Sequence, residues 1–266
     1  MGFFLVLKAE IVRGLIIMRR YWFASLTGIF IGYGMLLMLI QALVYGSGQI
    51  EDMAEQAVDG GLGFIIGIFA FGIVGLFTQG LQGMARTGEL EQVCMSPHGL
   101  VTNFMARSLV AAVSSIFSLS IIIALIAWSV EGTLYFAPLP TIVLLALTYL
   151  NLIGFGFMVG GLVLIFKQTG QIAMIIRLAM IGLAFPAQES LEGWPISLRV
   201  IVHALPVTNA SICLKKVLID GAGWAVLENY AFYFLILSCL VWTTLGIACF
   251  RYMENWSRDK GTLGAY

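Results

Sequence analysis

Six long apolar runs are the feature that most limits how this chain can fold. They cover roughly residues 22–45, 61–83, 108–129, 138–165, 170–187 and 230–250, and a run of about 18 apolar residues is long enough to span a bilayer as a helix. The composition agrees, since 60% of the 266 residues are hydrophobic and only 11% are charged. The sequence therefore predicts an all-α polytopic membrane protein, with six transmembrane helices in one domain over residues 1–266.

The Lys and Arg residues orient the expected helices. If the amino terminus is cytoplasmic, all 14 of them except Arg199, Lys215 and Lys216 fall on the inner side, as the positive-inside rule requires. The first apolar run follows Arg19 and Arg20 and is too long for a removable signal peptide. We therefore expect a multi-pass protein of the cell membrane, inner or plasma, with both termini cytoplasmic.

Residues 2–20 precede the first apolar run and combine apolar with basic side chains. Five apolar residues recur at intervals of three or four, the period of one helix face: Phe4, Leu7, Ile11, Leu15 and Met18. This pattern predicts an amphipathic helix that lies in the cytoplasmic membrane interface. The alternative is an ordinary positively charged flank of the first transmembrane helix.

Residues 186–229, between the fifth and sixth apolar runs, are too apolar for a solvated loop. Prolines divide this segment into pieces of about a dozen residues, which are too short to cross a bilayer. We expect two re-entrant outer helices, whose backbone must be buried in protein or line an aqueous cavity. They either gate a pathway or only pack on the bundle. The candidate gate residues are Phe185, Trp194, Leu205 and Pro206.

The loop of residues 84–106 is charged and contains Pro97. Carboxylates such as Glu89 and Glu91 are favourable near the amino end of a helix, by about 0.3–1 kcal/mol each, so we expect a short cytoplasmic helix that the proline ends. Three apolar residues would form a narrow stripe able to fill a groove on a partner: Leu90, Val93 and Cys94. The alternative is an amphipathic loop that rests on lipid headgroups.

Together these features resemble the membrane subunits of type-2 ABC exporters over nearly the whole chain. Members of that family have six spans, an amphipathic amino-terminal helix, a cytoplasmic coupling helix and two re-entrant helices before the last span. The stretch Gly88-Glu89-Leu90-Glu91-Gln92, followed by Pro97, is similar to the family's Gly-Thr-Leu-Glu-Gln-Leu followed by a proline. A second match is Leu-Pro-Val-Thr-Asn at 205–209, similar to the family's Pro-Leu-Thr segment. Glu89 departs from the frequent Thr, and Val93 from the frequent Leu.

The resemblance implies the partners of the chain. A separate ABC ATPase, in two copies, would dock on the coupling loop through Arg86, Gly88, Glu89, Leu90, Glu91, Gln92 and Pro97. ATP and magnesium would be bound by that ATPase and no cofactor by this chain, which has no G-x-x-x-x-G-K-[ST] phosphate loop. A second permease subunit in a homodimer, the lipid bilayer and an amphiphilic, drug-like or lipid-linked substrate would complete the system, without nucleic acid.

The sequence shows no catalytic or metal-binding machinery. The two histidines, His98 and His203, have no second ligand at metal spacing, and there is no nucleophile–base pair. We therefore expect the chain not to be an enzyme itself. An explanation of a different class is an uncoupled membrane channel or a structural membrane scaffold.

Polar residues within the apolar runs are the candidates for a transport pathway: Gln79, Gln82, Gln171 and Arg177. Arg177 lies about 10 Å into the fifth run at about 1.5 Å per residue, where a lipid-facing arginine costs up to about 3 kcal/mol. We expect it to snorkel to the inner headgroups. The alternative is a charge that faces a cavity or a partner at the inner mouth.

Glycines recur at four-residue spacing in the first two runs, as in Gly28 with Gly32 and Gly63 with Gly67. The fourth run contains four more, at 154, 156, 160 and 161. Small residues at this spacing let helix backbones approach closely. The sequence therefore predicts tight helix packing at these positions.

Overall fold

The computed structural model describes residues 2–47, 51–129, 134, 135, 137–166, 170–186, 191 and 193–260, without the side chains of 39, 40, 43–47, 51–57, 127 and 170. Over these ranges all regular secondary structure is helical. The elements are α1 (Gly2–Arg20), α2 (Trp22–Ser47), α3 (Glu51–Thr87), α4 (Glu89–Cys94), α5 (Gly99–Ser129), α6 (Pro138–Ile165), α7 (Gly170–Leu183), α9 (Ile196–Ala204), α10 (Thr208–Leu218), the 3-10 helix η1 (Gly223–Glu228) and α11 (Tyr230–Asp259).

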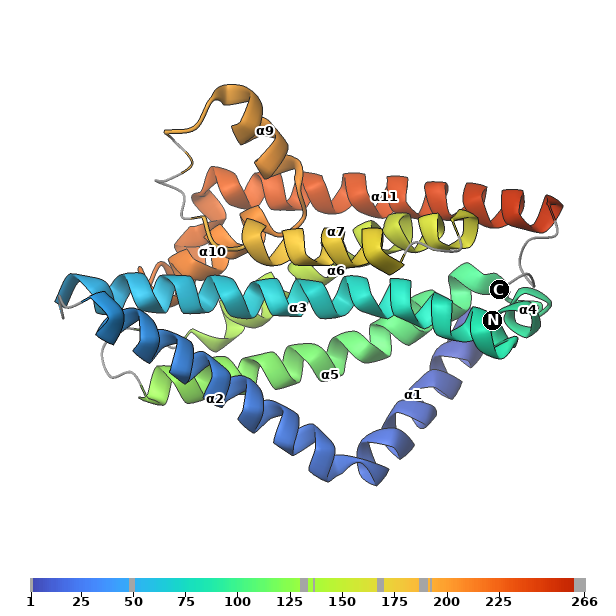
Figure 1. Cartoon of the computed structure of the whole chain (residues 1–266), viewed down its shortest axis with the longest axis horizontal. Coiled ribbons are helices and arrows are strands. Elements are labelled where there is room, and N and C mark those ends of the chain that lie inside the picture. The colour runs from blue at the N-terminus through green and yellow to red at the C-terminus, as the bar shows by residue number, and fades with distance from the viewer. Residues whose placement is uncertain are drawn as a thin grey trace.

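The long helices run along one axis of the molecule (Figure 1). Helices α3, α5, α6, α7 and α11 lie in this direction, while α1 and α2 meet at an angle on one flank. The start of α1, the end of α11 and α4 lie at the same end, and α10 lies near the opposite end (Figure 1). Contacts agree, because the space beside Gly2 is filled by His98, and Arg258 donates a hydrogen bond to the carbonyl of Cys94.

Four helical stretches are long and apolar enough to cross a membrane: Val58–Thr87, Gly99–Ile126, Pro138–Ile165 and Tyr230–Asp259. They coincide with the second, third, fourth and sixth apolar runs. The parts of the first and fifth runs with described side chains, Trp22–Met38 and Gln171–Leu183, are shorter apolar helices. Helices α9 and α10 pass the same test only as a pair bent by 83°. The chain is thus an all-helical, membrane-embedded protein, and the count of six spans stays a prediction.

Helix α6 is the centre of the bundle and is buried along most of its length. Gly156 and Gly160 face α3, where the side chains of Phe77 and Leu81 fill the space that the two glycines leave open. On the other side of α6, Gly154 packs directly on the backbone of α11, and a Cβ added at Gly246 would collide with the Gly154 carbonyl. The glycine pattern in the fourth run therefore produces the close packing that the sequence predicts.

Four phenylalanines fill the space where α3, α5, α6 and α11 come together. The ring centroids of Phe77 and Phe157 are 4.8 Å apart, those of Phe157 and Phe250 are 5.2 Å apart, and those of Phe77 and Phe104 are 6.1 Å apart. All four side chains are fully buried. Aromatic contacts at these distances add to the packing energy, so this cluster closes the middle of the bundle.

The contact between α6 and α11 can be tested with one substitution. We expect Gly246→Leu to destabilise the protein by about 1–3 kcal/mol or more, because overpacking forces the two backbones apart. The measurement is the temperature at which the detergent-solubilised protein loses its monodisperse size-exclusion peak. Gly182→Leu is the matched control, since a Cβ at Gly182 meets no atom within 4 Å. Equal melting of both variants would show that α6 and α11 are not held this closely.

Candidate functional site

Helix α4 is a short, well-delimited element between two glycines. Gly88 precedes it with φ of 73°, and Gly99 follows it with φ of 69°. These left-handed values favour glycine over residues with a side chain, so the two glycines set the entry and the exit of the loop. The expected short helix is present and ends at Cys94, before Pro97.

The exposed surface of α4 is polar. Arg86, Glu89, Glu91, Gln92 and Pro97 are all exposed. Leu90, which we expected on a stripe facing a partner, is completely buried within the chain's own core, and Val93 and Cys94 pack against that core. The stripe thus attaches α4 to its own bundle. The side chains that α4 itself leaves exposed are Glu89, Glu91 and Gln92, and the exposed Met95 follows them.

Helix α4 is held by several other elements. It packs against α3 and α5, and the Arg258 guanidinium at the end of α11 donates to the Cys94 carbonyl at 3.2 Å. The same guanidinium pairs with Glu254 at 2.6 Å. Burial raises the pKa of the Cys94 thiol, an effect that exceeds the opposing influence of Arg258. Helix α4 is therefore in contact with three long helices of the bundle.

Arg177 is buried between α7 and α3. Its side chain is only 6% exposed, its Nε donates to the Phe71 carbonyl at 3.0 Å, and its guanidinium lies 3.7 Å from the centre of the Phe71 ring. The notch left by Gly75 accommodates the rest of the group. This differs from the expected snorkelling conformation: the charge is buried among groups of its own chain and joins two helices.

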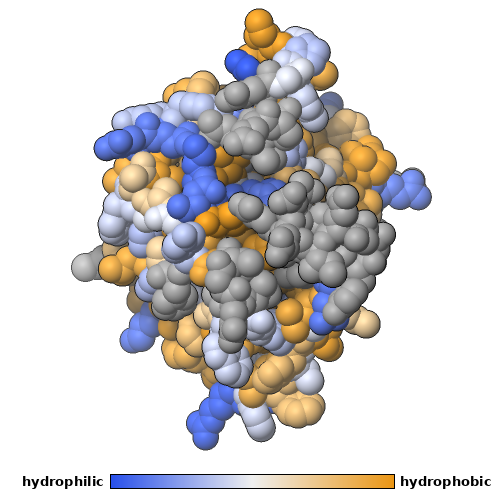
Figure 2. Space-filling view, turned by 90° about the vertical axis from the view of Figure 1, so that its left-hand side faces the viewer, coloured by the Kyte–Doolittle hydropathy of each residue, from blue (hydrophilic) through white to orange (hydrophobic). Residues whose placement is uncertain are grey.

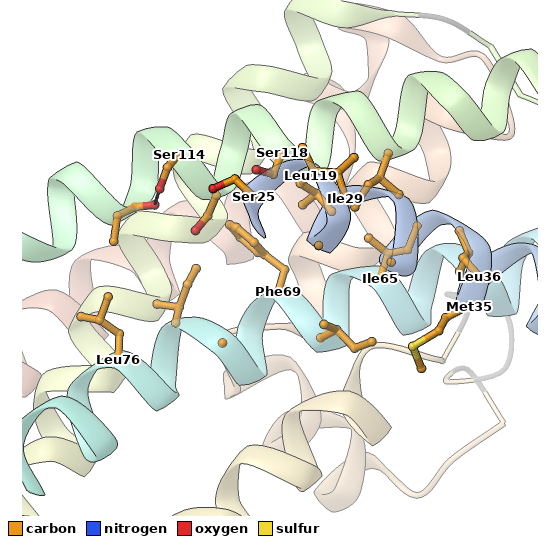
Figure 3. Close-up of a pocket in the computed structure, with 18 of the residues that line it drawn as sticks. Ser25, Ile29, Met35, Leu36, Ile65, Phe69, Leu76, Ser114, Ser118 and Leu119 are labelled. Atoms are coloured by element: carbon orange, nitrogen blue, oxygen red, sulfur yellow. Dashed lines mark hydrogen bonds between the residues drawn. The ribbon is translucent and has the colours of Figure 1, made fainter. Parts of the chain in front are cut away.

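The other pathway candidates do not join Arg177 in one site. Gln79 and Gln171 are exposed and Gln82 is half-buried. A cavity lies elsewhere, between α2, α3 and α5, and has a volume of about 470 Å³ (Figure 3). Its polar lining consists mainly of serines, which the sequence did not single out because single serines are common in apolar helices. None of the four candidates lines this cavity.

We use the name outer segment for the described residues between α7 and α11, which we expected on the outer side. This segment contains two short helices joined by a sharp bend, as the proline positions predict. Across the bend His203 Nδ1 and Asn209 Oδ1 are 2.7 Å apart, and Asn209 donates to the His203 carbonyl at 2.7 Å. The His203 ring also stacks on Phe234 of α11. The bend is therefore fixed by a reciprocal pair of side-chain contacts.

The backbone of the bend is satisfied by the bundle itself. Trp242 of α11 donates to the Ala204 carbonyl at 2.8 Å, and Asn151 of α6 donates to the Pro206 carbonyl at 3.1 Å. Asn151 lies about 20 Å along α6 from Pro138 at about 1.5 Å per residue, close to the midpoint of that helix. The segment thus enters the bundle deeply and finds the hydrogen-bond partners that lipid cannot supply.

One face of α10 caps the carboxyl end of α7. Thr208 donates to the Leu183 carbonyl, Ser211 to the Ala184 carbonyl and Lys215 to the Phe185 carbonyl, the last at 2.7 Å. Lys215 also forms an ion pair with Asp59 of α3 at 2.7 Å and is 5% exposed. Thr208, Ser211 and Lys215 are three and four residues apart, so the sequence alone places them on one face of a helix.

The gate candidates lie in different environments. The Phe185 ring contacts the Phe64 ring, Leu205 is half-buried and Pro206 is buried, whereas Trp194 is exposed beside α9. Helix α9 itself projects from the bundle with Ile196 76% exposed. Figure 2, which looks onto the end of the molecule opposite α4, shows a projection with hydrophobic residues at its top, where Figure 1 places α9.

The buried position of Arg177 predicts a loss of stability on a conservative change. We expect Arg177→Lys to lose the Nε–H donor and the planar stacking on Phe71, at a cost of about 1.5–3 kcal/mol for a charged hydrogen bond. The midpoint of thermal unfolding in detergent measures the effect. Arg251→Lys, at an exposed position of α11, is the control. If Arg177→Lys melts with the wild type, Arg177 does not hold α7 to α3.

A comparison with protein-family models gave no match, and a search among curated proteins gave none either.

Proposed function

We propose that this chain is the permease subunit of an ATP-driven exporter similar to the type-2 ABC family. Six spans would place both termini and α4 in the cytoplasm, with α1 in the inner membrane interface. The observation that carries the proposal is the position of α4. It lies at the end of the bundle where α1 starts and α11 ends, presents Glu89, Glu91 and Gln92, and is anchored to α3, α5 and α11.

The proposed cycle needs a homodimer of the permease and two copies of a separate ATPase. The ATPase binds ATP and magnesium, and closure of its two copies displaces each α4. Because Leu90 is embedded in the core and Arg258 bonds the end of α4, the displacement reaches the long helices. The outer helix pair α9–α10 then gates release of an amphiphilic, drug-like or lipid-linked substrate.

The alternative classes make different demands on the bundle. An uncoupled channel formed by one copy needs a water-filled path, whereas the middle of this bundle is filled by Phe77, Phe104, Phe157 and Phe250. A structural scaffold has no need for an exposed polar helix anchored to three others. Co-purification of an ABC ATPase supports the exporter, and ion conduction by the isolated chain in a planar bilayer supports the channel.

The docking role of α4 is tested by reversing one charge. We expect Glu91→Arg to abolish stimulation of the partner ATPase in reconstituted vesicles, because the reversed charge opposes docking, while insertion and dimerisation are unchanged. Glu228→Arg makes the same reversal at an exposed site in η1 and serves as the control. Normal stimulation by Glu91→Arg would remove the docking assignment.

The six-span arrangement is tested by labelling. In a background without the native cysteines, Gly193→Cys and Gly221→Cys should both react with an impermeant thiol reagent added outside cells, because both lie in the outer segment. Glu89→Cys should react only after the membrane is permeabilised. Labelling of positions 193 and 221 from opposite sides would mean that α9 and α10 form one broken span.

A further inference from the structure

The cavity between α2, α3 and α5 has a polar part and an apolar part. Serines from two helices lie at one end of it, and aliphatic side chains with Met35 line the other end (Figure 3). Leu76, the lining residue of α3 that is nearest to α4 in sequence, lies on the serine side (Figure 3). The polar lining residues are Ser25, Ser114, Ser115, Ser118 and Tyr149.

The chemistry of this lining selects a type of ligand. None of the lining residues carries a charge, and their polar side-chain groups are all hydroxyls. The hydroxyls of Ser25, Ser114 and Tyr149 already donate to backbone carbonyls. A hydroxyl that donates can still accept a hydrogen bond, so these groups suit a headgroup whose own hydroxyls donate. An anionic or zwitterionic headgroup would be buried here without a counter-charge, which is costly.

The shape of the cavity suits a hydrocarbon chain. Its lining extends from Ala24 to Leu36 along α2, a distance of about 18 Å at about 1.5 Å per residue. The volume of about 470 Å³ lies within the range of about 300–1,000 Å³ typical of small-molecule sites. Met35 is 54% exposed and Ile68 is 44% exposed, so the apolar part opens sideways, toward the surface that lipid would cover.

We propose that this cavity binds a neutral amphiphile with one hydrocarbon chain and a hydroxyl-bearing headgroup. The hydrocarbon chain of the ligand lies between α2 and α3 beside Met35 and Ile68. The hydroxyls of its headgroup form hydrogen bonds with the serines of α2 and α5. The inference rests on the proposed export function. It adds a substrate class, and it adds a site within one protomer where the substrate enters from the bilayer.

Two glycines allow the cavity to be filled without disturbing its walls. A Cβ added at Gly28 of α2 or Gly72 of α3 meets no atom within 4 Å, and both residues line the cavity. A leucine side chain at either position would therefore fill part of the cavity in which we place the ligand. Gly182 of α7 is equally unobstructed but lies outside the cavity, which makes it a matched control.

The test is photolabelling of the full-length protein in phosphatidylcholine vesicles. The probe is a monoacylglycerol with a diazirine in its acyl chain, and peptide mass spectrometry locates the label. We expect label on the lining segments of α2, α3 and α5, reduced at least fivefold by Gly28→Leu with Gly72→Leu and unchanged by Gly182→Leu. Unlabelled monoacylglycerol should compete, and phosphatidylglycerol should not.

Three outcomes overturn the proposal. Label spread evenly over the outer surface and insensitive to the leucines would mean that the cavity binds no amphiphile. Equal competition by phosphatidylglycerol would remove the preference for a neutral headgroup. Conversion of a dimer to monomers by the leucines, with labelling unchanged, would identify a second copy of the chain as the occupant. Because the labelling needs no ATPase, its result is independent of the Glu91→Arg test.

Discussion

The contact of α6 with α3 on one side and α11 on the other determines where the remaining elements lie. In lipid, helix association depends on close van der Waals packing more than on the hydrophobic effect, and the glycines of α6 provide that packing. Once α11 is drawn against Gly154, its Trp242 faces the bend between α9 and α10. The depth of the outer segment is thus a consequence of two backbones that meet without intervening side chains.

Buried polar groups follow the same arrangement. Backbone carbonyls at the end of α7 and at the α9–α10 bend would be costly to leave without hydrogen bonds in hydrocarbon. Side chains of α6, α10 and α11 donate hydrogen bonds to them. Lys215 completes the set through Asp59. Movement of α10 away from α7 would break these bonds, so specific side-chain contacts hold the outer segment in place.

Local patterns in the sequence predicted where the helices lie. Contacts between residues distant in the sequence determined what the side chains on those helices face. The helix at Glu89, the proline-bounded outer pieces and the glycine face of α6 follow from spacing alone. The orientation of Leu90 did not, because a stripe on a six-residue helix looks the same whether it faces its own core or a partner. The environments of Arg177 and Lys215 depend on Phe71 and Asp59, which are distant in the sequence. The cavity arises where α2 leaves Gly28 unpacked, and an absence of contact has no sequence signature.

The position of Gly2 and Lys260 at one end of the bundle has a practical consequence. Gly2 lies beside His98, and the last turn of α11 bonds to α4. A peptide linker from α11 of one copy to α1 of the next therefore starts and finishes at the same end of the bundle. Two copies can be encoded as one polypeptide, so that a substitution is placed in one half while the other half stays intact.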